Sequence, residues 1–295
     1  MSDHLVRLIT RDGTLRAIAA DTTLLTEECR RRQQTDPTAT VALGRLATAA
    51  ALMGGLLKGD QRLALIVEGN GPLQRLQAET DAVGRVRATL KEPVAGLPPR
   101  EGRFDVAGAV GAAGFLHVVK DLGLKEPYRG MVQLATSEIG EDLAYYLATS
   151  EQTPSTVALG VELDREAHVA AAGGFLLQLL PGGDPALVDR LEERLAQLPP
   201  TTTLLRQGVA PAAILERLLD GIPLTNLGQI PLVFACTCGR EQVANVLKML
   251  DRSDLDDLLD DPGEATVTCE FCKEVYRFDH AELQAIRDGL DQPLV

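Results

Sequence analysis

The sequence has no Trp, and Phe and Tyr bring its aromatic content to only 3%. Proteins that bind single-stranded nucleic acids stack bases on aromatic side chains, so this chain lacks their usual platform. It also lacks an excess of positive charge, because 29 Lys and Arg face 42 Asp and Glu and give a net charge of −13. An acidic surface repels phosphate backbones. We therefore expect no nucleic-acid partner.

No segment is typical of a membrane span or a secretory signal. The most apolar stretch, residues 41–57, contains Arg45 and three glycines and is short for a span, which predicts a buried helix instead. The N-terminus begins M-S-D-H and lacks a basic region followed by an apolar one. These features predict a cytoplasmic protein with no membrane partner. In a reducing compartment, five cysteines indicate metal or redox chemistry rather than structural disulfides.

Motifs of common enzymes are missing as well. The sequence has no G-x-x-x-x-G-K-[ST] loop for nucleotide phosphates, no H-E-x-x-H protease motif and no G-x-S-x-G hydrolase elbow. Its one glycine-rich run, Gly108, Gly111 and Gly114, does not have the dinucleotide-binding spacing. We therefore expect no catalytic residues, no nucleotide cofactor and no enzyme activity.

The first part of the chain, residues 1–181, combines short strand-like runs with a few helical stretches. Turn residues separate the runs as in an antiparallel meander. One helix is expected over residues 38–58 with Asp36 or Thr38 as its cap, and a later helix is expected to be capped by Ser137. Because the strands come in runs, we predict an α+β fold with a mixed or antiparallel sheet and accompanying helices.

Residues 182–230 form a connector that is rich in leucine. Two amphipathic helices are expected in it, over residues 185–198 and 211–219, with Pro199-Pro200 interrupting the chain between them. Leucine recurs at every fourth position of the first helix, whereas a solvated linker would contain fewer leucines. We therefore expect a helical, apolar linker whose leucines cover part of residues 1–181.

The C-terminal part, residues 231–295, is a separate acidic unit, in which six Lys and Arg face fourteen Asp and Glu. It contains two close pairs of cysteines, Cys236-Thr237-Cys238 and Cys269-Glu270-Phe271-Cys272. Zinc takes four ligands in a tetrahedron, and each close pair can supply two corners. The spacing predicts one zinc ion per chain, bound by Cys236, Cys238, Cys269 and Cys272. Four buried thiols without a metal are the alternative interpretation.

This unit has few apolar aromatic side chains for a core, so its fold is expected to depend on the metal. Asp279 and Glu282 have the spacing of a capping box and predict a last helix. The fifth cysteine, Cys29, precedes Arg30, Arg31 and Arg32, which lower a thiol pKa when they lie close to it. The favoured interpretation is nevertheless a partly buried structural thiol.

The chain resembles the family of redox-regulated bacterial heat-shock chaperones of about thirty-three kilodaltons, the 33 kDa chaperonin family of holdases. The resemblance rests on Cys236-T-Cys238-G-R-E and Cys269-E-F-Cys272 and covers essentially the whole chain. It also rests on segments far from the cysteines: ALGRL from Ala42, LKGD from Leu57, EPYRG from Glu126, EDLAYYL from Glu141, SEQ from Ser150 and GGFLLQLLP from Gly173.

The resemblance implies a substrate-binding and dimerising domain over residues 1–181, a helical linker over 182–230 and a zinc-binding redox switch over 231–295. It implies that the reduced, zinc-bound form is inactive. Oxidants would form the disulfides Cys236–Cys238 and Cys269–Cys272 and release zinc. The oxidised homodimer would then hold unfolding client proteins without ATP.

Two other classes of protein remain as alternatives. A zinc-ribbon nucleic-acid module is disfavoured by the acidic tail and the lack of stacking aromatics. A thiol–disulfide oxidoreductase would use Cys269 and Cys272. In such enzymes a C-x-x-C motif follows a strand and opens a helix, whereas Cys272 is followed by K-E-V-Y-R-F, which is a strand pattern.

Overall fold

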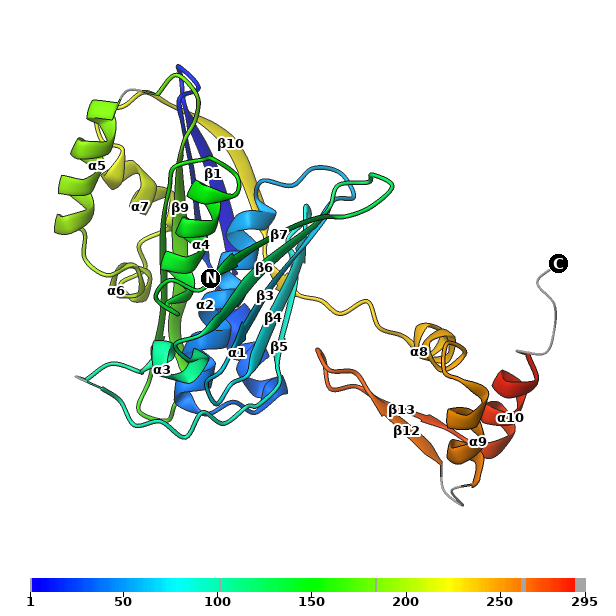
Figure 1. Cartoon of the computed structure of the whole chain (residues 1–295). Helices are drawn as coiled ribbons and strands as arrows, with labels where there is room; N and C mark the ends of the chain where they lie inside the picture. The colour runs from blue at the N-terminus through cyan, green and yellow to red at the C-terminus, as the bar shows by residue number, and fades with distance from the viewer. Residues whose placement is uncertain (1, 101, 184, 261–263, 290–295) are drawn as a thin grey trace. The chain divides into compact units, whose positions relative to one another are not determined.

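A computed structural model describes residues 2–100, 102–183, 185–260 and 264–289. The chain divides into two compact units, the first ending at Ala235 and the second beginning at Cys236 (Figure 1). Both units combine helices and strands, so the predicted α+β class is confirmed. No helix among these residues is long and apolar enough to cross a membrane.

The first unit contains a five-stranded antiparallel sheet with the strand order β10-β1-β2-β9-β8. Its strands are β1 (His4–Thr10), β2 (Leu15–Asp21), β8 (Ser155–Leu163), β9 (Val169–Leu179) and β10 (Leu224–Pro231). Strand β10 was not expected from the sequence, because L-T-N-L-G-Q-I-P has neither a clear alternation nor a strong strand composition. Its pairing with β1 places the end of the leucine-rich connector within this sheet.

A second sheet has six strands in the order β11-β5-β4-β3-β6-β7. Only the pair of β11 with β5 is parallel, so this sheet is mixed. Its strands are β3 (Arg62–Gly69), β4 (Arg75–Asp81), β5 (Arg85–Leu90), β6 (Gly114–Asp121), β7 (Tyr128–Gln133) and β11 (Val233–Phe234). The antiparallel meander expected from the turn residues is present as β3, β4 and β5.

Helix α2 (Pro37–Gly54) packs between the two sheets and is buried along almost its whole length. Asp36 begins it as expected, because the side chain of Asp36 accepts a hydrogen bond from the Ala39 backbone N–H at 2.8 Å. Three further helices complete this part of the unit: α1 (Thr23–Gln33), α3 (Val106–Val110) and α4 (Ile139–Thr149). The apolar stretch of residues 41–57, which is short for a membrane span, therefore lies mainly in the central core helix α2.

The expectation that Ser137 caps the following helix is wrong. Glu138 occupies the N-cap position of α4, and Ser137 has a left-handed backbone with a φ of 62°. The Ser137 hydroxyl instead donates a hydrogen bond of 2.5 Å to the backbone carbonyl of Gly111. The serine therefore joins two loops that are distant in sequence, a role that no local pattern indicates.

The leucine-rich connector folds as α5 (Pro185–Gln197), α6 (Thr201–Arg206) and α7 (Pro211–Leu218). These helices contact the five-stranded sheet on the face opposite to α2, as Figure 1 shows. The apolar side chains that they bury against β1, β2 and β9 are Leu191, Leu204, Leu205, Ile214, Leu215 and Leu218. The expectation that these leucines cover the first part of the chain is confirmed.

The second unit contains α8 (Arg240–Leu247), α9 (Arg252–Asp260), the hairpin of β12 (Ala265–Thr268) with β13 (Val275–Phe278), and α10 (His280–Gly289). The capping box is present, because Asp279 and Glu282 exchange side-chain to backbone hydrogen bonds of 2.9 and 3.0 Å. A small core joins the helices to the hairpin: Val243, Leu247, Leu255, Ala265, Phe278, Leu283 and Ile286.

Candidate metal centre

Two separate backbone segments position the four cysteines of the second unit. Cys236-Thr237-Cys238 lies in irregular chain between β11 and α8. Cys269 and Cys272 lie in the turn that joins β12 to β13. The C-x-x-C motif is therefore part of a hairpin and does not open a helix, which disfavours a thioredoxin-like oxidoreductase.

Two backbone hydrogen bonds close the hairpin turn around its cysteines. The Cys269 N–H donates to the Glu274 carbonyl, and the Lys273 N–H donates to the Cys269 carbonyl, both at 2.9 Å. Lys273 takes the left-handed conformation with a φ of 60°, which lets the chain reverse directly after Cys272. The turn thus brings the two thiols of the pair together.

The four sulfur atoms converge on one point, all lying within 4.8 Å of one another. The Cys236 Sγ is 3.7 Å from the Cys269 Sγ, and the Cys238 Sγ is 3.2 Å from the Cys272 Sγ. A tetrahedral ion with Zn–S bonds near 2.3 Å requires sulfurs separated by about 3.8 Å. The predicted residues are therefore brought together in an arrangement that can hold one metal ion.

Burial raises the pKa of both the Cys238 and the Cys272 thiols. Thiolates in these positions consequently need a positive charge beside them, which a bound cation supplies. The Tyr276 hydroxyl donates a hydrogen bond to the Cys238 Sγ at 3.3 Å. This bond favours the thiolate and lowers the pKa of Cys238, but it offsets only part of the rise that burial causes. The donor set of four sulfurs fits zinc better than a hard cation such as magnesium.

Sequence analysis did not identify Tyr276 as part of the site. Tyr276 lies on β13 opposite Val267 and packs partly against the small core. Its only signal in the sequence is an aromatic residue shortly after the second cysteine pair in a strand-like run. The contact with Cys238 joins residues far apart in the chain and depends on the fold of the hairpin against the first cysteine segment.

Cys29 is not part of the cluster. Its side chain is buried on α1, and burial raises the pKa of its thiol to about 12. Arg30 pairs with Glu27 and Arg31 pairs with Glu28, so acidic neighbours engage the positive charges that follow the cysteine. The expected burial of Cys29 is confirmed, and it is deeper than expected.

A two-sheet α+β unit followed by a small unit with four convergent cysteines defines a protein with a candidate metal-binding module. Comparison with known proteins identifies the family. The family profile described as Hsp33 protein matches residues 3–279. A 33 kDa chaperonin of Syntrophotalea carbinolica is 61% identical over 286 residues, which are 97% of this chain and 99% of the relative.

A second relative, the 33 kDa chaperonin of Geobacter sulfurreducens, is 52% identical over 98% of this chain and 96% of its own length. The crystal structure of the 33 kDa chaperonin of Thermotoga maritima matches with a TM-score of 0.91 at 35% sequence identity, covering 98% of this chain and 99% of that one. The chain therefore belongs to the Hsp33 family, as the sequence motifs indicated. Membership in this chaperone family supports a chaperone role.

Proposed function

We propose that this protein is a redox-regulated, ATP-independent holdase that keeps unfolding proteins from aggregating under oxidative stress. The observation that carries the proposal is the convergence of the four thiols in a unit with a small apolar core. A unit of this kind gains much of its folding free energy from the metal, about 10–16 kcal/mol in zinc-finger peptides. Chemistry at the thiols therefore controls whether the unit stays folded.

In the reduced form, Cys236, Cys238, Cys269 and Cys272 hold one zinc ion. When bound, zinc stabilises the thiolate forms and links the two cysteine segments. Tyr276 orients and polarises the Cys238 sulfur through its hydrogen bond. No carboxylate or histidine among the described residues joins the ligand cluster.

A peroxide accepts the electrons when the thiolates are oxidised. Two thiolates, one hydrogen peroxide molecule and two protons give one disulfide and two water molecules. Cysteines that have become a disulfide no longer bind the metal as thiolates, so the second unit loses its main stabilising interaction. The consequence is unfolding of this unit.

The proposed disulfides are Cys236–Cys238 and Cys269–Cys272, which rest on the family resemblance. The shortest sulfur distances instead join the two segments, Cys236 with Cys269 at 3.7 Å and Cys238 with Cys272 at 3.2 Å. Mapping of disulfide-linked peptides after peroxide treatment distinguishes the two pairings. Mainly crosswise links would contradict the proposed assignment.

We further propose that residues 182–230 transmit the loss of the metal to residues 1–181, which bind clients. Supporting this, the leucines of α5, α6 and α7 are buried on the five-stranded sheet. The linker ends in β10, which pairs with β1, so after the switch region, residues 231–295, unfolds, release of the linker also requires this pairing to open. The active form would be a cytoplasmic homodimer that binds unfolding proteins and has no enzyme activity.

Three measurements before and after peroxide treatment test this function on the full chain: zinc content, the number of free thiols, and suppression of aggregation of a thermally unfolding client. We expect one zinc per chain and no suppression in the reduced form, then loss of zinc, loss of four thiols and suppression without ATP. The variant Cys29→Ser is the matched control, because Cys29 is buried and outside the cluster. Equal suppression in both states would overturn redox regulation.

A further inference from the structure

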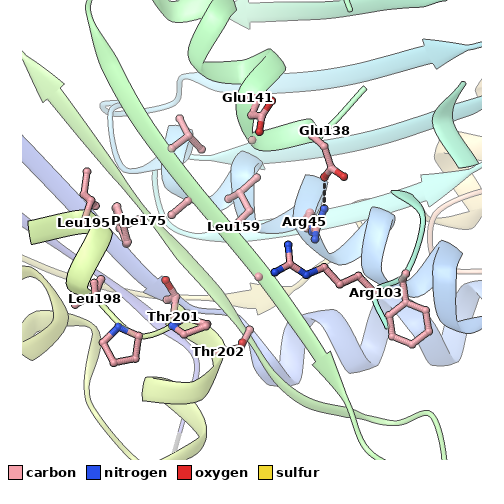
Figure 2. Close-up of a pocket in the computed structure, with 17 residues that line it drawn as sticks. Arg45, Arg103, Glu138, Glu141, Leu159, Phe175, Leu195, Leu198, Thr201 and Thr202 are labelled. Atoms are coloured by element: carbon pink, nitrogen blue, oxygen red, sulfur yellow. Dashed lines mark hydrogen bonds and ion pairs between the residues drawn. The ribbon is translucent and has the colours of Figure 1, made fainter. Parts of the chain in front are cut away.

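A groove runs along the edge of β8 in the first unit. Its volume is about 540 Å3, which lies in the range of binding pockets. The floor consists of residues 157–160, the central part of β8. Figure 2 shows side chains on both sides of this strand. The groove therefore follows the open side of a strand.

The outer side of β8 has unpaired main-chain groups. Strand β8 is the last strand of the five-stranded sheet and bonds to β9 on its other side only. Alternate residues of an antiparallel strand direct their N–H and C=O groups away from the paired neighbour. Among the described residues, no backbone group pairs with residues 157–160 on that outer side. Main-chain donors and acceptors are thus available in the groove.

Proteins normally protect such edges with short strands, charged residues, prolines or bulges. Strand β10, at the other edge of the same sheet, contains Gly228 and Pro231, and its pairing with β1 has a register shift. Strand β8 is nine residues long, S-T-V-A-L-G-V-E-L, without proline or a basic residue. Its one charged side chain, Glu162, is paired with Arg206 at 3.2 Å. The pairing of β8 with β9 also has a register shift, but it lies between Glu162 and Leu163, so residues 157–160 themselves carry none of these protections.

The two walls of the groove differ in chemistry, as Figure 2 shows. One wall is mainly apolar and comes from β9 and from the end of α5 with the chain after it: Phe175, Leu195, Leu198, Pro199, Pro200, Thr201 and Thr202. The other wall is mainly charged and contains Arg45, Arg103, Glu138 and Glu141 together with Phe104 and Gly140. An added strand would therefore face an apolar wall with every second side chain and a charged wall with the others.

We propose that the edge of β8 is the place where an unfolded client segment binds, by adding an extended strand to the sheet. The inference rests on the proposed holdase function and specifies its client-binding site. Main-chain pairing recognises any extended polypeptide, while the walls favour segments that alternate apolar and polar residues. Part of the apolar wall belongs to the linker, so release of the linker would open the groove on that side and leave the edge of β8 accessible to a client.

The first test uses a labelled peptide of about eight residues, similar in length to β8, that alternates valine with threonine, lysine and glutamate. Two further versions carry N-methyl groups, one on the valine amides and one on the polar residues' amides. The N–H groups of alternate residues point to the same side of a strand. We expect one methylated peptide to lose at least about tenfold in affinity and the other to bind as the parent does. Equal affinities for all three peptides would overturn the proposal.

The second test uses Gly160→Val. A Cβ at Gly160 would lie 2.6 Å from the Cγ2 of Thr202, so the valine side chain enters the space between β8 and the apolar wall. Thr156→Val adds the same residue to the exposed start of the same strand, outside the groove, and is the matched control. We expect peptide binding to weaken about tenfold in the first variant only. Unchanged binding in Gly160→Val contradicts the site.

Hydrogen exchange locates the peptide independently of any variant. We expect the peptide to protect amides of residues 155–163 in the peroxide-treated chain and to leave β7, an edge strand of the other sheet, unchanged. Protection elsewhere in the chain would overturn the proposal that a client binds at this edge. Protection of β8 without peptide that increases with protein concentration would also overturn it, and would assign the edge to a second copy of the chain. Failure of the wild type to suppress aggregation after peroxide would instead contradict the proposed function itself.

Discussion

Arg240 and Glu282 form an ion pair that connects the first cysteine segment to the last helix. Arg240 lies two residues after Cys238, and its Nη2 donates to both carboxylate oxygens of Glu282, at 2.6 and 2.7 Å. The same carboxylate accepts the backbone N–H of Asp279 in the capping box of α10. Arg240 also lies over the ring of Phe278, 4.5 Å from its centre. The position of the thiols is thus coupled to the start of α10 and to the core.

Removal of zinc with a chelator under reducing conditions should therefore unfold residues 236–289. The core of this unit is too small to replace the metal, and the Arg240–Glu282 pair is exposed and contributes little by itself. Hydrogen exchange should show loss of protection in α8, α10 and the β12–β13 hairpin. Helix α2 and strands β3, β4 and β6 should keep their protection, because they belong to a separate core that does not include the linker helices. Persistent protection of the second unit without metal would show that the thiols do not control its fold.

Tyr276→Phe should weaken zinc binding by about tenfold, a typical effect of removing a group that hydrogen-bonds a ligand. The substitution keeps the ring in the small core and removes only the hydroxyl that donates to the Cys238 Sγ. Competition with a zinc-binding dye measures the affinity. Tyr145→Phe, at an exposed position on α4, is the control and should bind zinc as the wild type does. If both variants keep the affinity of the wild type, the hydrogen bond has no part in holding the ligand.

The triple substitution of Leu191, Leu195 and Leu215 by Ser should activate the chaperone without oxidant. Leu191 and Leu215 are buried between the linker helices and the five-stranded sheet, and Leu195 is partly buried there. Large-to-small changes at such positions cost about 2–5 kcal/mol each, enough to detach the linker while zinc remains bound. Client aggregation and hydrogen exchange of residues 185–218 measure the two effects.

The control for the linker variant replaces three exposed aliphatic residues outside the linker, Leu24, Val83 and Leu124, by Ser. These changes remove as many aliphatic side chains but leave the covered face of the sheet unchanged, so the protein should stay inactive until it is oxidised. A linker variant that also stays inactive, with its linker helices still protected, would show that the leucines do not restrain the reduced form.

The stability of the first unit should depend on pH through the titration of Asp3. Its carboxylate accepts the backbone N–H groups of Leu24 and Leu25, at 3.1 and 2.6 Å, and so caps α1. Burial outweighs these hydrogen bonds and raises the pKa of Asp3 from 3.8 to about 6. The folded form therefore binds a proton more readily than the unfolded form, and this residue's contribution to stability falls as the pH rises from about 4 to 6.

Asp3→Asn removes this titration while keeping a side-chain oxygen that can accept a hydrogen bond. Relative to the wild type, the free energy of unfolding of the variant should increase between pH 4 and 7, by at most about 3 kcal/mol. Urea titrations followed by circular dichroism at several pH values measure it. A difference between the two proteins that does not change with pH would show that Asp3 does not titrate in this range.

Local patterns predicted a large part of this structure. Asp36 and the Asp279–Glu282 capping box begin helices where they were expected, because these interactions span only three residues of chain. Ser137 failed as a cap because Gly111, distant in sequence, accepts its hydrogen bond. Strand β10 was missed for a related reason. Its strand composition is weak, and the interaction that stabilises it is pairing with β1, more than 200 residues earlier in the sequence.

The spacing of the cysteines was enough to identify the four candidate ligands. Two pairs of cysteines with one and two residues between them can converge on a single ion wherever the chain between the pairs folds back, and the leucine spacing of the linker requires an apolar surface to cover. The folded structure was needed to establish which sulfurs lie closest, that Tyr276 reaches Cys238, and that β8 has an open edge between two walls. These relationships join residues far apart in the chain, so they depend on how helices and sheets pack, and no spacing along the sequence encodes them.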